Sequence, residues 1–363
     1  MKIFLLLVIC LILVSLVYIT VTKIKFENYR GKISSTYCRF AVTKNLPTDP
    51  VIFVPGIKGS TLEKDSQIIW LKPSQAISSD SSLSYTGVDD IKATGIFTGL
   101  TVIPFLFEYK PYYKISADLS CVPNSYLFYY DWRDYPDINS KLFGELVERV
   151  IKDTGKKPSI IAHSMGGLIA HGYIKEHPEN INKIVYISVP FQPGVGYFDD
   201  VNEGVSIGLN KKLLSKEVIF SHPATYLLMP HKGSNKYEGK ELMEAKTWRD
   251  NRFSIFKDST IDVDLDKFQR TLDRIANYHK ILDTPKTLDN AFLFVIGKCY
   301  QTVLTIDKDG NRSYVPGDGR VSETSSYPLD NLTNKKIEVF CKTHDQQMND
   351  DEIIRSIFEF LNS

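Results

Sequence analysis

Short apolar runs recur along the chain, and several of them end at a Pro, Gly or Asp. Their β-branched and aromatic residues are typical of strands that are buried on both faces of a sheet. The predicted strands cover residues 51–54, 126–130, 159–162, 184–189, 291–296 and 337–340.

Helices are predicted in the stretches between and after these runs. Residues 141–154 carry apolar side chains at helical spacing, residues 164–176 follow the third predicted strand directly, and residues 350–361 close the chain. Because strands alternate with helices, we expect an α/β fold: a mostly parallel central sheet covered by helices on both faces.

Two stretches are too long to be simple connections in a minimal alternation of strands and helices. Residues 58–120 separate the first two predicted strands, and residues 192–290 separate the fourth and fifth. Insertions of this length are usually functional, and both leave the carboxyl side of the sheet, where open α/β folds place their ligands. We therefore predict one domain over residues 51–363, with a lid-containing insertion at 58–120, a cap insertion at 192–290 and a lead-in at 23–50.

The N-terminus carries a longer apolar segment. Ile3 to Val21 is nineteen residues without a charge, enough for a helix to span a bilayer. A cleaved signal peptide is the alternative, but signal h-regions are about 7–15 residues long and residues 17–20 make a poor cleavage site. We predict a transmembrane anchor over residues 1–22 and a single-pass membrane localisation, with secretion through a signal peptide as the alternative.

Composition and charge narrow the classes of partner. The 363 residues are 43% hydrophobic and 24% charged, which suits a globular protein with a large core. Lys and Arg total 44 against 43 Asp and Glu, for a net charge of +1. Nucleic-acid binding needs a basic excess or stripe, so nucleic acid is not an expected partner.

Charges and cysteines point to different compartments. Positive residues after the apolar segment favour a cytoplasmic body; they are Lys23, Lys25, Arg30 and Lys32. Four cysteines outside the segment are compatible with two disulfides in an oxidising compartment, or equally with buried thiols. These are Cys38, Cys121, Cys299 and Cys341.

A nucleophile motif follows the third predicted strand. Residues 162–167 read Ala-His-Ser-Met-Gly-Gly between that strand and a helix. This is the nucleophile elbow G-x-S-x-G with Ala at its first position, in which a strained turn lifts the serine Oγ above the sheet. The residues two before and two after must be small so that strand and helix can approach. We predict Ser164 as the nucleophile of an α/β-hydrolase fold.

Serine needs a base to take its proton, normally an oriented histidine. In α/β-hydrolases the chain order is nucleophile, acid, base. Of the seven histidines, only His344 follows the last predicted strand, and we predict it as the base. His163 lies beside the nucleophile, but we expect its side chain to point away from the pocket.

The acid should follow the penultimate strand, and Asp318 stands there between Gly317 and Gly319. Its carboxylate would hold the imidazole tautomer and stabilise the imidazolium. Asp307 and Asp309 are alternatives in a segment that indicates a hairpin turn. Asp345, directly after the base, is poorly placed to orient it.

An oxyanion hole needs two backbone donors. We predict the amide of Met165, after the nucleophile, and that of Ile57, in the glycine-rich loop at residues 55–60. That loop lacks the Gly-Lys-Ser/Thr ending of a phosphate-binding P-loop. Histidines and cysteines show no metal-ligand spacing, so neither a metal nor another cofactor is expected.

Together these motifs resemble the lecithin:cholesterol acyltransferase family, which includes phospholipid:diacylglycerol acyltransferases and lysosomal phospholipase A2. Tyr-Asp-Trp-Arg at 130–133 and Pro-x-x-Tyr-Leu-Leu-x-Pro at 223–230 are more specific than the serine motif. The matching segments occur in the family's order at residues 51–60, 130–133, 162–167, 188–191, 223–230 and 317–321.

The resemblance implies the same residues in the same roles, and it adds Trp70 as a lid tryptophan near the acyl pocket. A disulfide between Cys299 and Cys341 would also match a family pattern. The sequence departs from the family where Arg320 and Ser322 replace the more usual Thr and Pro.

The expected activity is acyl transfer from a lipid ester through an acyl-enzyme. With water as acceptor the protein would be a lipase or phospholipase, and with an alcohol it would be an acyltransferase; the same three residues serve both. Alternatives are an esterase for small soluble esters and a non-catalytic membrane-anchored binding module. The apolar segment at residues 95–107 is read as a packed lid in preference to a membrane contact.

Overall fold

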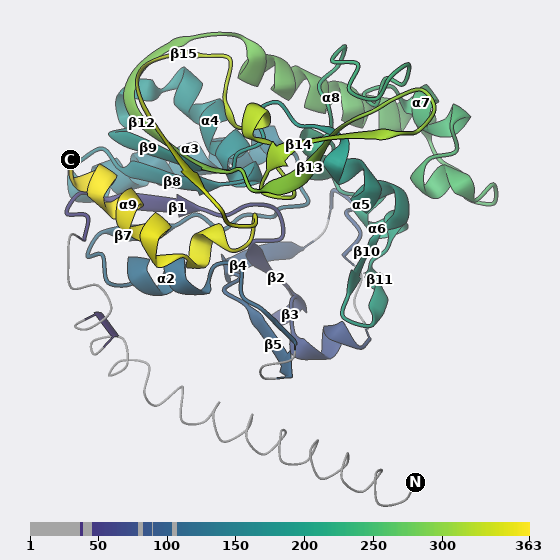
Figure 1. The fold of residues 1–363 in the computed structure, drawn as a ribbon. Helices are drawn as coiled ribbons and strands as arrows, with labels where there is room; N and C mark the ends of the chain where they lie inside the picture. The colour runs from purple at the N-terminus through teal and green to yellow at the C-terminus, as the bar shows by residue number, and fades with distance from the viewer. Residues whose placement is uncertain (1–36, 39–45, 79–82, 89, 104–106) are drawn as a thin grey trace, which may run out of the picture.

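The fold was analysed in a computed structural model that describes residues 37–38, 46–78, 83–88, 90–103 and 107–363 (Figure 1). Six strands form one parallel sheet in the order β15-β12-β9-β8-β1-β7. Their bounds are β1 Val51–Val54, β7 Ser125–Leu127, β8 Ser159–His163, β9 Lys183–Ile187, β12 Thr287–Gly297 and β15 Asn331–Phe340. The predicted α/β fold class is confirmed.

Successive residues of the central strands pack into two separate hydrophobic cores, one on each face of the sheet. Ile52 and Val54 of β1 pack with one cluster, whereas Val51 and Phe53 pack with the other. The first cluster is covered by α3 Pro136–Thr154, α4 Met165–Glu176 and α8 Leu265–Asp283. The second is covered by α2 Tyr113–Leu119 and α9 Asp351–Asn362, which lie together on the opposite face of the sheet (Figure 1). Burial on both faces explains the continuous apolar runs.

The register of the sheet brings strand ends together. Val54 of β1 pairs with Ala162 of β8, so both strands end at the same level. The loop at residues 55–60, named here the oxyanion loop, therefore begins beside the start of α4. The second predicted strand is shorter than expected: β7 ends at Leu127, and the chain then turns so that the Tyr130 amide donates to the Ser60 hydroxyl, 3.1 Å away.

Residues 58–120 and 192–290 carry small elements of their own. The first stretch holds an antiparallel sheet in the order β3-β2-β4 and a β5–β6 hairpin. Their bounds are β2 Ser60–Lys64, β3 Gln67–Trp70, β4 Ile91–Ile96, β5 Leu100–Ile103 and β6 Phe107–Tyr109. The second holds α5 Phe198–Glu203, β10 Val205–Ile207, β11 Asn210–Leu214, α6 Lys216–Phe220, α7 Ala245–Asp250 and α8.

A third segment outside the central sheet lies between β12 and the last strand, β15. β13 Tyr300–Ile306 and β14 Arg312–Gly317 form an antiparallel hairpin. It extends across the carboxyl side of the sheet toward α5 (Figure 1). Asp318 follows β14 directly, so this hairpin delivers it back to the sheet.

Two disulfides join the four cysteines that the sequence left open. Cys299 pairs with Cys341 across the ends of β12 and β15, as the family resemblance implied. Cys38 pairs with Cys121, which ties the lead-in to the chain just after α2. The second bridge closes a separation of 83 residues, and long closed loops restrict the unfolded chain most.

The prediction of a single-pass membrane localisation is corrected. No helix among the described residues is long and apolar enough to cross a bilayer, and the proposed anchor at residues 1–22 lies outside those residues. The 19-residue helices α3 and α8 have the length but not the composition. Lys141, Glu145 and Glu148 line the outer face of α3, because that helix covers a sheet on one side and meets water on the other.

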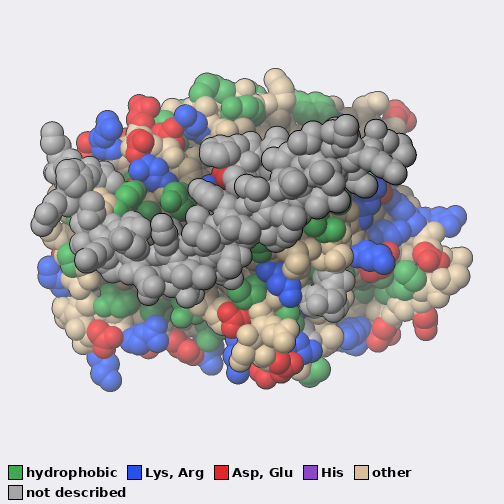
Figure 2. Space-filling view, turned by 90° about the horizontal axis from the view of Figure 1, so that it is seen from below, with side chains coloured by type: hydrophobic (Ala, Val, Ile, Leu, Met, Phe, Trp, Pro, Cys, Tyr) green, Lys and Arg blue, Asp and Glu red, His purple; other side chains and the backbone are tan. Residues whose placement is uncertain are grey.

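Charged side chains of both signs are intermixed on the visible surface seen from below (Figure 2). This mixture agrees with the net charge of +1.

The approach of α4 to the oxyanion loop leaves no room for a side chain at Gly166. A Cβ there would lie 2.2 Å from the Pro55 carbonyl oxygen. Ala is favoured over Gly in a helix by about 1 kcal/mol, but overpacking of this kind costs about 1–3 kcal/mol. We predict that Gly166→Ala lowers the free energy of unfolding in urea. Gly95→Ala is the control, since no atom lies within 4 Å of its Cβ position. Unchanged or higher stability of Gly166→Ala would contradict the packing argument.

Candidate active site

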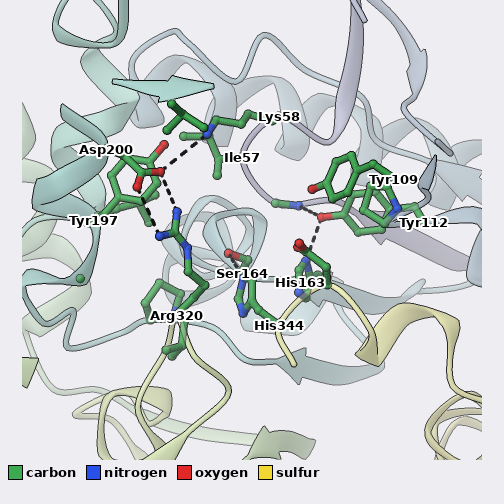
Figure 3. Close-up of a pocket in the computed structure, with 18 of the residues that line it drawn as sticks. Ile57, Lys58, Tyr109, Tyr112, His163, Ser164, Tyr197, Asp200, Arg320 and His344 are labelled. Carbon is green, nitrogen blue, oxygen red and sulfur yellow. Dashed lines mark hydrogen bonds and ion pairs between the residues drawn. The ribbon is translucent and has the colours of Figure 1, made fainter. Parts of the chain in front are cut away.

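Ser164 occupies a strained turn between β8 and α4. Its backbone has φ 54° and ψ −133°, in a region that L-residues rarely adopt. The turn is held from both sides, because the Ser164 amide donates to the Ile187 carbonyl at 3.0 Å and the Gly167 amide donates to the Ser164 carbonyl at 2.9 Å. The residue is 5% exposed, and its side chain faces the cavity (Figure 3). The local geometry is that of the predicted elbow.

The structure brings Ser164, His344 and Asp318 into one chain of hydrogen bonds. The Ser164 Oγ lies 2.9 Å from His344 Nε2, and His344 Nδ1 lies 2.7 Å from Asp318 Oδ2. His344 stands in the turn after β15, and its amide also donates to the Asp318 carbonyl at 3.1 Å. Backbone and side chain thus fix the imidazole against the same residue.

The Asp318 carboxylate is buried and heavily hydrogen-bonded. Burial alone would raise its pKa, but the charge and hydrogen bond of His344, with the amides of Val321 and Arg320, lower the pKa of Asp318 to about 2. Those amides donate to Oδ1 at 2.7 Å and 2.9 Å. Gln347 Nε2 donates to Oδ2 at 3.1 Å. Asp318 is therefore ionised at neutral pH and accepts the Nδ1–H of His344.

The rival acids lie elsewhere. Asp307 is in the exposed turn of the β13–β14 hairpin, where its carboxylate accepts from the amides of Asp309 and Asn311 at 2.9 Å and 2.8 Å. This is a self-capped turn, as the alternative interpretation of that segment indicated.

Sequence reasoning missed Gln347. It is fully buried, and besides holding Asp318 its Oε1 accepts from the Ser188 hydroxyl at 3.0 Å. Ser188 directly follows β9, so Gln347 links the acid to the neighbouring strand end. Its position three residues after the predicted base was the available signal.

The orientation of the His163 side chain contradicts the prediction made from the sequence. Its side chain was expected to point away, yet it lines the cavity with Ser164, and its ring centroid lies 4.6 Å from that of His344 (Figure 3). Its Nδ1 lies 2.8 Å from the Tyr112 hydroxyl. Burial, and then the charge of His344, lower the pKa of His163 well below its ordinary value, so this ring is neutral.

The predicted oxyanion donors flank the nucleophile. Met165 is the first residue of α4, and the first amides of a helix have no acceptor within it. Ile57 lies in the turn closed by the Gly59 amide and the Gly56 carbonyl, 3.1 Å apart, and lines the cavity. Their joint use as donors remains a prediction.

The cavity above Ser164 has a volume of about 700 Å³. Trp70 lies in its wall, buried, and its indole N–H donates to the Lys58 carbonyl at 2.9 Å. Apolar side chains from both insertions and the β13–β14 hairpin make up much of the remaining lining; they include Leu71, Leu100, Val205, Ile207, Leu228 and Val303.

An ionic cluster forms another part of the wall. The Arg320 guanidinium donates to both Asp200 oxygens, at 2.6 Å and 3.3 Å, and Lys58 Nζ lies 3.8 Å from Oδ2 (Figure 3). Both cations also approach the Tyr197 ring. Burial lowers the pKa of Lys58 despite its proximity to Asp200. The cluster joins the oxyanion loop, the loop after β14 that carries Asp318 and Arg320 (the acid loop), and α5.

The fold and this arrangement can be compared with known proteins. The model of the lecithin:cholesterol acyltransferase family matches residues 120–346, more than half of the chain. The chain belongs to the lecithin:cholesterol acyltransferase family.

Two curated relatives match over shorter stretches. The chain is 32% identical over 109 residues to the uncharacterized protein YJR098C of Saccharomyces cerevisiae, covering 29% of this chain and 16% of the relative. It is 29% identical over 135 residues to the phospholipase A(1) LCAT3 of Arabidopsis thaliana, covering 33% and 30%. The matches therefore span less than a third of either relative's length.

One solved structure supports the fold of this family member, and a second aligns less well. A Tle4–Tli4 complex aligns with a TM-score of 0.50 at 12% identity, covering 86% of this chain and 98% of that one. The Bacillus licheniformis lipase BlEst2 in its mature form aligns at 0.40 and 10% identity, covering 88% and 95%.

The contacts of His344 predict its titration. Burial lowers the pKa of His344, but the Asp318 charge and hydrogen bond outweigh it, so the pKa lies above the ordinary value of about 6.5. Asp318→Asn removes that charge, and we expect the His344 pKa, followed by imidazole NMR, to fall. Asp309→Asn should leave it unchanged. An equal shift in both variants, or none in Asp318→Asn, would reject Asp318 as the partner.

Proposed function

We propose that this protein transfers the acyl group of a lipid ester through an acyl-enzyme on Ser164. The observation that carries the proposal is the unbroken hydrogen-bond chain from Ser164 Oγ through His344 to the ionised Asp318. This chain opens onto a cavity of about 700 Å³ whose lining is largely apolar, with an ionic cluster in one part of its wall.

In the first half-reaction, Ser164 Oγ attacks the ester carbonyl carbon while His344 Nε2 takes the hydroxyl proton. Asp318 holds Nδ1–H and stabilises the imidazolium that forms. The amides of Ile57 and Met165 hydrogen-bond the developing oxyanion. His344 then passes its proton to the leaving alkoxide, and the acyl group stays on Ser164 as an ester.

In the second half-reaction, His344 takes a proton from the acceptor hydroxyl, whose oxygen attacks the acyl-enzyme. Collapse of the tetrahedral intermediate breaks the bond to Ser164 Oγ, which recovers its proton from His344. Water as acceptor gives a fatty acid, and an alcohol gives a new ester. The three side chains act alike in both cases, so the lid and cap insertions decide the outcome by controlling acceptor access.

The shape of the cavity supports a lipid substrate. Trp70, Leu100 and Leu228 line a volume far larger than a short acyl chain needs. A site of this size and apolar lining gains affinity from each methylene that it removes from water, about 0.8 kcal/mol per buried CH₂. We therefore assign Trp70 to the acyl-binding wall.

The first test is product analysis with a phospholipid labelled in its acyl chain, presented in mixed micelles with and without diacylglycerol. We expect Ser164→Ala to lose activity by about 10⁴-fold or more, because no other group can form the acyl-enzyme. Ser74→Ala, at an exposed serine, should match the wild type.

The labelled product identifies the acceptor. Free fatty acid in both mixtures means hydrolysis, and labelled triacylglycerol in the presence of diacylglycerol means acyl transfer to an alcohol. Equal product from Ser164→Ala and the wild type would refute the mechanism. Turnover of short soluble esters without turnover of micellar lipid would favour a small-ester esterase.

We expect the titration of His344 to determine the acid limb of the pH profile of kcat/KM, the range in which activity falls as pH drops. Only the neutral imidazole accepts the serine proton, so kcat/KM should fall as pH drops through the His344 pKa, which Asp318 raises. Asp318→Asn should move this limb to lower pH and also reduce the plateau, because the imidazolium loses its stabilising charge. An acid limb that stays in place in Asp318→Asn would assign it to another group.

A further inference from the structure

We infer that Tyr112 is a positioning residue that fixes the oxyanion loop through the Gly56 amide, with His163 holding its hydroxyl. The role in catalysis rests on the proposed function, because it concerns the donor at Ile57, next along the loop. Neither residue belongs to the predicted nucleophile, acid, base or donors. Both line the cavity beside Ser164 (Figure 3).

Two hydrogen bonds link Gly56, Tyr112 and His163. The Gly56 amide donates to the Tyr112 hydroxyl at 2.8 Å, and that hydroxyl lies 2.8 Å from His163 Nδ1. While it accepts from the amide, the hydroxyl still has its single hydrogen to donate, and His163 Nδ1 is within reach as the acceptor. The neutral His163 tautomer with its proton on Nε2 serves this arrangement.

Crowding explains why the loop needs an external constraint. A Cβ at Gly56 would lie 2.8 Å from the Ser164 Cβ, so only glycine is tolerated. Glycine also has the most freely rotating backbone, and the peptide that carries the Ile57 amide joins Gly56 to Ile57. A donor that moves by about 1 Å loses much of its catalytic effect. The Tyr112 hydroxyl supplies the restraint that a side chain on Gly56 would otherwise give.

Tyr112 itself is firmly placed. It is 3% exposed, and its ring packs edge-on against Phe53 of β1 at 5.5 Å between centroids. It also packs edge-on against His163 at 5.6 Å. His163 in turn packs against His344 with its ring tilted, so the chain of contacts runs from the Gly56 amide to the ring of the proposed base.

Other aromatic residues hold the loop through its carbonyls. The Tyr130 hydroxyl donates to the Pro55 carbonyl at 2.9 Å, and the Trp70 indole donates to the Lys58 carbonyl at 2.9 Å. Loss of the Tyr112 hydroxyl alone therefore leaves the loop attached at both ends. This predicts a folded variant with a misplaced amide, not an unfolded one.

The experiment compares Tyr112→Phe with Tyr113→Phe, which removes a hydroxyl from the adjacent residue, 56% exposed. We expect Tyr112→Phe to lower kcat by about 10–100-fold with KM nearly unchanged, within the loss known for a weakened oxyanion donor. Affinity for an alkyl trifluoromethyl ketone, which forms a tetrahedral adduct with a serine, should fall by the same factor, while affinity for a fatty acid stays constant. Tyr113→Phe should behave as wild type. Wild-type kcat in Tyr112→Phe would overturn the proposal.

A double-mutant cycle tests the role of His163. His163→Leu removes the acceptor, whereas His163→Asn keeps an oxygen near the position of Nδ1 and should restore part of kcat. If both residues act through one hydrogen-bond chain, the losses in Tyr112→Phe and His163→Leu are not additive. Fully additive losses, or no difference between Asn and Leu, would overturn the linkage.

Amide hydrogen exchange at Gly56 tests the hydrogen bond from the Gly56 amide to the Tyr112 hydroxyl without relying on catalytic activity. Exchange should be faster in Tyr112→Phe than in Tyr113→Phe, because the amide loses its acceptor. Equal exchange in both variants would overturn the proposal whatever their activity. A wild type that turns over no ester would refute the proposed function and with it the catalytic role of Tyr112, whereas a fully active Tyr112→Phe would refute that role alone.

Discussion

The structure depends on the close convergence of three backbone segments at Ser164. The end of β8, the first turn of α4 and the oxyanion loop approach so nearly that a Cβ at Gly56 would lie 2.8 Å from the Ser164 Cβ, and one at Gly166 would lie 2.2 Å from the Pro55 carbonyl oxygen. The strained φ of Ser164 is sustained because these neighbours leave the chain no relaxed alternative. Ser164 and Ile57 thereby come to line one cavity.

Because of the same crowding, the oxyanion loop is fixed by side chains from other segments. Glycines admit the approach but do not fix the loop, so its backbone groups are held by Tyr112, Tyr130 and Trp70. Trp132 adds a bond from its indole to the Ser60 carbonyl at 3.1 Å. The Tyr-Asp-Trp-Arg element, which indicated the family in the sequence, therefore also has a structural role. Two of its four side chains hold the loop that the nucleophile faces.

The sequence predicted those features of the fold and the site that local residue patterns determine. Buried parallel strands leave continuous apolar runs, so the sheet and its order along the chain could be read directly, and the position of His344 after the last strand followed from that order. The contacts of His163 and Tyr112 join residues far apart in sequence, and no spacing encodes them. His163 was misjudged because the strained turn at Ser164 redirects the chain away from regular strand alternation. The Cys38–Cys121 bridge was unpredictable for a related reason, since the lead-in carries no periodic pattern that places it on the sheet.

The departure from the family at Arg320 shows how the cap is bound to this site. A single carboxylate of α5, Asp200, meets a cation from the acid loop and another from the oxyanion loop. The side chains of Asp200 and Lys58 are only 11% and 16% exposed, so neither charge is well compensated by water. Removing Asp200 would take this ion pair from the largely buried Lys58, which is more costly than breaking a surface pair. The insertion that shapes the cavity wall is thus electrostatically joined to both loops that surround Ser164. A change in the position of α5 would therefore act on the loop at Arg320 and on the loop at Lys58 together.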